Sequence, residues 1–134
     1  MARALHLPTM LFHVELVGAL FVVWGALTTL IGLSTLALGL AAASLARSAG
    51  EEGAVPVAAG LTAAAFTTLA VIAIAWGAAH IAVGLPLRRH RPAARLAALM
   101  LGMVDLLLLP YGTALGAYTL WVLLREDGKR LFAQ

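Results

Sequence analysis

Residues 17–40, VGALFVVWGALTTLIGLSTLALGL, repeat glycine at every seventh position: Gly18, Gly25, Gly32 and Gly39. The next apolar segment carries a second heptad of small residues: Ala63, Ala70, Gly77 and Gly84. The two series mirror each other about Glu51, since paired numbers such as 18 and 84 always sum to 102. Small residues let the backbones of two lipid-embedded helices approach closely. The pattern therefore predicts two antiparallel helices that fold at residue 51 and pack through these residues.

The composition is typical of a membrane protein. Of the 134 residues, 63% are hydrophobic and 11% are charged, and the mean hydropathy is +0.99. A soluble domain of this size needs a polar surface that this chain does not supply. Charged residues are absent from 16–46 and from 53–87, and each stretch is longer than the about 20 residues that cross a bilayer core. Two shorter apolar runs follow, at 96–109 and 111–124.

These runs predict an all-α fold, an integral membrane four-helix bundle that forms one domain over residues 1–134. Backbone groups in lipid have no water to bond, so each run must be helical. The bundle combines a long N-terminal hairpin with a short C-terminal one. The expected helices span about residues 10–46, 54–86, 93–109 and 112–127.

The distribution of arginine predicts the orientation of these helices. The connection at residues 87–95 holds four arginines, whereas the connection at 47–53 contains Glu51 and Glu52. Because arginine and lysine collect on the cytoplasmic side, we expect the basic connection and both termini to be cytoplasmic. Arg3, Lys129 and Arg130 near the ends of the chain agree with that orientation.

The chain carries few groups for chemistry. It has no cysteine, which excludes disulfides, thiolate metal sites and iron–sulfur ligation. No phosphate loop, nucleophile elbow or zinc-protease motif is present. We therefore expect no catalytic residue, no metal and no cofactor. The formal charge of +3 comes from residues near membrane boundaries and fits anionic lipid headgroups better than nucleic acid.

Ionisable residues inside membrane segments are candidates for function. Glu15 is expected to form a salt bridge with Arg88 or Arg89 at the headgroup boundary, or to serve as a proton- or cation-binding carboxylate. His80 lies three residues after Gly77 on the small-residue face. It is expected to donate to a backbone carbonyl, or to act as a functional group.

Asp105 is the strongest candidate among these residues. It lies five residues before Pro110, where the chain is expected to turn at Tyr111. That fold brings the Thr113 or Tyr118 hydroxyl close enough to satisfy its carboxylate. The group would then clamp the short hairpin, or relay a proton or contact a ligand. The small residues Gly112 and Gly116 are expected to pack this hairpin.

The C-terminal part of the chain resembles a widespread family of small bacterial four-helix membrane proteins of unassigned function. The resemblance rests on GLPLRR at 84–89, RPAAR at 91–95, PYGTALGAYTLWVLL at 110–124 and Leu131-Phe132. It covers about the last fifty residues. The resemblance implies the four-helix fold and a multi-pass protein of the bacterial inner (cytoplasmic) membrane, but it supplies no activity.

The sequence favours a non-enzymatic protein that self-associates, or that serves as an accessory subunit of a larger membrane complex, through its glycine-rich helix faces. Its partners would be the lipid bilayer and copies of itself or other membrane-protein subunits, without nucleic acid. The alternative is a small oligomeric transporter or channel that uses Glu15 or Asp105 for proton or cation coupling. A third possibility is a carrier of a lipophilic ligand such as haem, quinone or carotenoid.

Overall fold

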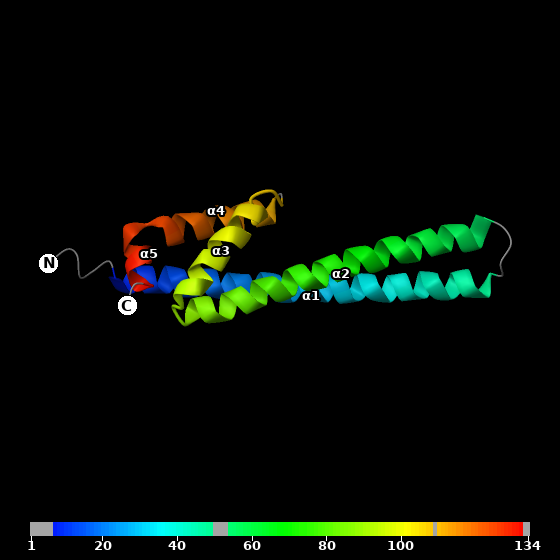
Figure 1. The fold of residues 1–134 in the computed structure, drawn as a ribbon, viewed down its shortest axis with the longest axis horizontal. Coiled ribbons are helices and arrows are strands. Elements are labelled where there is room, and N and C mark those ends of the chain that lie inside the picture. The colour runs from blue at the N-terminus through cyan, green and yellow to red at the C-terminus, as the bar shows by residue number, and fades with distance from the viewer. Residues whose placement is uncertain (1–6, 50–53, 109, 133–134) are drawn as a thin grey trace. The chain divides into compact units, whose positions relative to one another are not determined.

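The computed structural model describes residues 7–49, 54–108 and 110–132, and within these ranges it contains helices and no strand. This confirms the all-α prediction. The expected fold point at Glu51 and the N-terminal Arg3 lie outside the described residues. The helices are α1 (Leu7–Ser48), α2 (Ala54–Arg88), α3 (Pro92–Asp105), α4 (Tyr111–Leu124) and α5 (Glu126–Leu131), as labelled in Figure 1.

Two of these helices are long and apolar enough to cross a membrane. The apolar segments are Thr9–Ser48 in α1 and Ala54–Arg88 in α2, with mean hydropathies of 2.2 and 2.1. Both helices run a few residues beyond the predicted bounds. In α2 the helix continues past Pro86 to Arg88.

The C-terminus of α2 is closed by a Schellman motif. The N–H of Arg91 donates to the carbonyl of Pro86 at 3.2 Å, and the N–H of His90 donates to the carbonyl of Leu87 at 3.0 Å. His90 adopts a φ of 54°, the left-handed conformation that this motif requires and that glycine usually supplies. Pro92 then occupies the first turn of α3, where its missing N–H is harmless.

Helix α3 ends at Asp105, four residues before the predicted end at 109. Pro110 is the physical reason, because it has no N–H to donate to the carbonyl of Leu106 one turn earlier. The hydroxyl of Thr113 donates to that carbonyl instead, at 3.0 Å. The turn between α3 and α4 is therefore held by a side chain that replaces the missing backbone donor.

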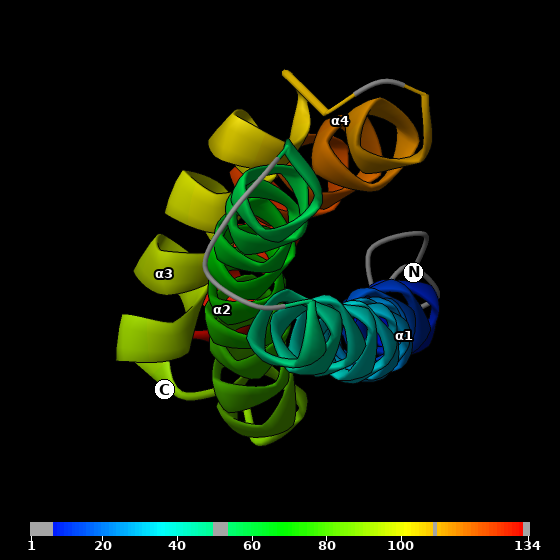
Figure 2. The ribbon, with the colours of Figure 1, turned by 90° about the vertical axis from the view of Figure 1, so that its right-hand side faces the viewer.

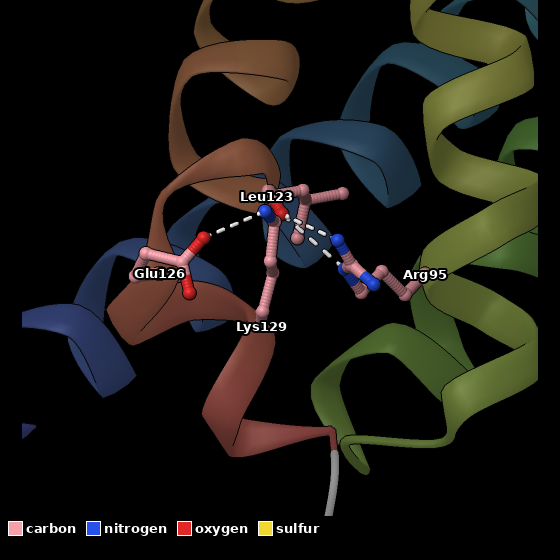
Figure 3. A network of polar contacts seen from close by, with 4 residues as sticks. All are labelled: Arg95, Leu123, Glu126 and Lys129. Carbon is pink, nitrogen blue, oxygen red and sulfur yellow. Dashed lines mark hydrogen bonds and ion pairs between the residues drawn. The ribbon is translucent and has the colours of Figure 1, made fainter.

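The fourth predicted helix, 112–127, is divided into α4 and α5. Arg125 adopts an extended conformation with φ −65° and ψ 146°, and α5 turns away from α4 after it (Figure 1). Arg95 of α3 holds the break, since its guanidinium donates from Nε and Nη2 to the carbonyl of Leu123 at 3.2 and 3.1 Å. Beside it, the Lys129 ammonium contacts the Glu126 carboxylate at 2.8 Å (Figure 3).

The chain divides into two compact units, of which unit 2 comprises Gly25–Ala79. In this unit α1 and α2 approach through small residues, and Figure 2 shows the two helices end on. A Cβ added at Gly77 would collide with the Gly25 carbonyl, and one added at Gly32 would lie 3.1 Å from the Ala70 carbonyl. One added at Gly39 would lie 3.4 Å from the Ala63 carbonyl. The predicted partners therefore lie opposite one another.

Unit 1 comprises Met1–Trp24 and His80–Gln134. The mirrored pair Gly18 and Gly84 meets here, since a Cβ at Gly84 would lie 2.8 Å from the Gly18 carbonyl. Helices α3 and α4 pack antiparallel through Gly102, Gly112 and Gly116, and a Cβ at Gly116 would collide with the carbonyl of Gly102. The buried core takes side chains from all five helices or their ends: Val14, Val17, Phe21, Leu87, Ala94, Ala98, Val122, Leu123 and Phe132.

Candidate functional site

A fully buried pair of ionisable side chains lies in unit 1. His80 Nε2 of α2 and Asp105 Oδ2 at the end of α3 are 2.9 Å apart, and both side chains are 0% exposed. Both residues were sequence candidates. The partner of Asp105 is His80 rather than the hydroxyl of Thr113 or Tyr118.

The surroundings of the pair are largely apolar. The ring of Phe21 lies 5.1 Å from the ring of His80, with 34° between their planes. Asp105 Oδ1 and the hydroxyl of Thr119 are both buried, and neither has a hydrogen-bond partner within the described residues. Thr119 lies on α4 and contacts the position of Gly102, one turn before Asp105. Buried ionisable groups require a partner, and here His80 and Asp105 are partners of each other. The second carboxylate oxygen, Oδ1, has no hydrogen-bond partner within the described residues.

The other hydroxyls expected near Asp105 serve different purposes. The Thr113 hydroxyl closes the α3–α4 turn as described above. Tyr118 forms a hydrogen bond of 2.8 Å with Nδ1 of His13 on α1. Gly112 lies against the backbone of Asp105, since a Cβ there would be 2.7 Å from the Asp105 carbonyl. The short hairpin therefore brings together Asp105, Thr113 and Tyr118, but the two hydroxyls do not satisfy the carboxylate.

A second cluster in unit 1 contains aromatic and ionisable side chains and includes Arg125, the residue just before α5. The ring of Trp121 lies 5.8 Å from His13 and 6.1 Å from Tyr118. The guanidinium of Arg125 lies 4.9 Å from the centre of the Trp121 ring, a cation–π geometry. His13 is half-buried here. An amphipathic cluster of this kind suits a membrane interface.

Glu15 does not form the expected salt bridge. Its side chain is exposed, and no ion pair joins it to Arg88 or Arg89 in the described part of the chain. The stem of Arg88 instead covers Gly18, since a Cβ added at that glycine would lie 2.5 Å from Arg88 Cγ. The glycine thus accommodates the arginine stem at the helix contact.

Residues 7–49, 54–108 and 110–132 contain no group of three or more histidine, cysteine, aspartate or glutamate side chains arranged to hold a metal ion. The His80–Asp105 pair provides one imidazole and one carboxylate. What it offers chemically is a shared proton and one open carboxylate oxygen, in apolar surroundings.

Comparison with protein-family models, with characterised proteins and with solved structures finds no match to this chain.

Proposed function

We propose that this chain is a multi-pass integral protein of a bacterial inner membrane. The observation that carries the proposal is the apolar outer surface of α1 and α2, where large side chains such as Leu30 and Ile31 are 60% and 63% exposed. Burial of such surface is favourable by about 25 cal/mol per Å², so water is a poor solvent for it and lipid a good one. The bacterial location rests on the sequence resemblance of the C-terminal segments.

Both termini are proposed to be cytoplasmic. The four arginines at residues 87–95 favour that side for the connection between α2 and α3. Helices α3 and α4 have 14 residues each, about 21 Å of helix, which is shorter than the about 30 Å hydrocarbon core. Because they are antiparallel neighbours, the chain returns to the cytoplasmic side whether the short hairpin spans a thinned bilayer or enters it only partly.

We further propose that the protein is non-enzymatic and associates with a second copy of itself. Helix α2 has 35 residues, about 52 Å, and even a tilt of about 40° places only about 39 Å of helix in the hydrocarbon core. The outer part of the hairpin carries exposed apolar side chains beyond that depth, among them Leu45 and Val57. A partner that covers them removes apolar surface from the polar headgroup region and water.

We propose that this association does not use the glycine-rich helix faces that the sequence favoured. Gly25, Gly32, Gly39 and Gly77 already pack between α1 and α2 of one chain. Substitution of these glycines is therefore expected to damage the hairpin itself. The proposed association uses the exposed apolar side chains in the outer part of the hairpin, such as Leu45 and Val57. Another membrane subunit that covers the same side chains would serve in place of the second copy.

Native mass spectrometry of gently extracted protein tests the association. We expect a defined homo-oligomer that dissociates in the variant Leu45→Gln/Val57→Gln. Leu124→Gln, an exposed leucine at the end of α4, is the matched control and should leave the oligomer intact. A different bound subunit would replace self-association with an accessory role, and a monomer under all conditions would contradict both forms of the proposal.

A second candidate function is proton- or cation-coupled transport. The buried His80–Asp105 pair favours it, because ionisable groups inside membrane segments mark proton and ion pathways. Asp105 is the better of the two predicted carboxylates, since Glu15 is exposed. Proton or substrate flux into proteoliposomes that is lost in Asp105→Asn would support it, and flux unchanged in that variant would contradict this role of Asp105.

A further inference from the structure

We propose that the His80–Asp105 pair is a reversible proton-binding site, whose acceptor atom is Asp105 Oδ1. The inference deepens the second candidate function, but proton binding does not itself require transport. It rests on the 2.9 Å contact of two side chains that are 0% exposed, and on the carboxylate oxygen that has no partner within the described residues.

The proton balance follows from the geometry. In the tautomer with a proton on His80 Nδ1, one further proton lies between His80 Nε2 and Asp105 Oδ2, and the pair is neutral overall whichever of these two atoms carries it. A second proton adds to Oδ1, which gives a neutral carboxylic acid beside an imidazolium and a net charge of +1. Release of that proton restores the neutral pair, and only N–H and O–H bonds form or break.

The open oxygen favours a proton over a metal cation. A calcium ion takes six to eight oxygen ligands and a magnesium ion about six in octahedral array. The described surroundings offer Asp105 Oδ1 and the buried hydroxyl of Thr119, which also has no partner there. Two oxygens are too few for such a cage. A proton needs only a lone pair of Oδ1 and no cage of further oxygens.

Other titratable groups on the same elements lie well away along the helix axes. On α1, Glu15 precedes the contacting Phe21 by six residues, about 9 Å, and His13 precedes it by eight, about 12 Å. On α2, Arg88 follows His80 by eight residues, about 12 Å. On α3, Arg95 precedes Asp105 by ten residues, about 15 Å. On α4, Tyr111 is exposed and Tyr118 bonds His13.

The chain offers an unusually direct measurement of this site, because Asp105 and Asp127 are its only aspartates. Protein labelled with carboxyl-¹³C aspartate in an Asp127→Asn background reports Asp105 alone by infrared spectroscopy. The measurement keeps the pair intact, so it does not depend on whether a variant of the pair folds. We expect a labelled protonated-carboxyl band to appear reversibly on acidification while helix content stays constant.

Variants then test the role of histidine. In His80→Gln the midpoint of the Asp105 band should move by about tenfold or more in proton concentration, whereas Glu126→Gln should leave it in place. A carboxyl whose protonation never changes while the protein stays folded would overturn the proposal. A midpoint insensitive to His80→Gln, or a band that sodium or potassium abolishes at constant pH, would also overturn it.

Flux measurements separate this inference from the transport function. A labelled band that titrates as expected, together with no flux in proteoliposomes, leaves the proton site standing and refutes transport. Flux without a titrating Asp105 refutes the proton site and leaves transport standing through other residues.

Discussion

His80 and Asp105 connect α2 to the end of α3 through a hydrogen bond of 2.9 Å that solvent does not reach. The two residues are 25 positions apart in the chain, and the side chain of each is the ionisable hydrogen-bond partner of the other. The bond therefore ties the part of α2 that lies in unit 1 to the short hairpin, and substitution of either residue removes it.

Removal of one member of the pair should be more harmful than removal of both. Asp105→Leu or His80→Leu leaves an uncompensated buried group, and we expect each to lower the free energy of unfolding by about 3–5 kcal/mol. The double variant replaces the pair with apolar side chains and should lose less than the sum. Reversible unfolding in mixed micelles measures all three. Additive losses would mean that the two side chains do not interact.

The close helix contact in unit 2 predicts opposite effects for two glycines of α2. Gly77→Ala places a methyl group against the Gly25 carbonyl and Thr29, so it should cost about 1–3 kcal/mol through overpacking. Gly60 has nothing within 4 Å of an added Cβ. Gly60→Ala should therefore be neutral, or stabilise the helix by up to about 1 kcal/mol. Equal responses of the two variants in thermal unfolding would contradict the observed register.

The hydroxyl of Thr113 should be required for the turn between α3 and α4. Thr113→Val keeps the shape but leaves the Leu106 carbonyl without its donor, and we expect a loss of about 1–3 kcal/mol. Thr113→Ser retains the hydroxyl and is the matched control. Thermal unfolding compares them, and equal stability of the valine and serine variants would show that the bond contributes nothing.

The pKa of Glu126 should lie below the ordinary value for glutamate. The hydrogen bond and positive charge of Lys129 lower it, with smaller contributions from Arg130 and Arg95. A lowered pKa in the folded state means that the contact stabilises α5 above the unfolded pKa of the glutamate and is lost as the pH falls through the folded value. Carboxyl chemical shifts measure the titration. Lys129→Ala should raise the pKa of Glu126, and an unchanged value would contradict the contact.

The packing of the long helices was predictable because a helix repeats its face at a nearly fixed interval. The glycine heptad at Gly18, Gly25 and Gly32 defines one face of a helix, and the mirrored numbers define its antiparallel partner. The structure places these partners opposite each other within its two units. The breaks after Asp105 and at Arg125 were not predicted. They depend on which side chain satisfies which carbonyl, as Thr113 does for Leu106 and Arg95 does for Leu123.

The members of the buried site were identified from sequence, but their partners were not. Asp105 and His80 are conspicuous because charge is rare in apolar segments. Their pairing depends on how α3 sits against α2, which no periodic pattern encodes. The contact between His13 and Tyr118 joins residues 105 positions apart, and only the folded chain reveals it.

The proposal that this chain spans a bilayer is tested most directly by thiol labelling of single-cysteine variants in intact cells. The absence of native cysteine makes the background clean. Ala49→Cys, just after α1, and Ala93→Cys, near the start of α3, are both exposed positions. A membrane-impermeant reagent should label Ala49→Cys in intact cells and Ala93→Cys only after permeabilisation. Labelling of both positions from outside, or recovery of the protein in the soluble fraction, would contradict the account.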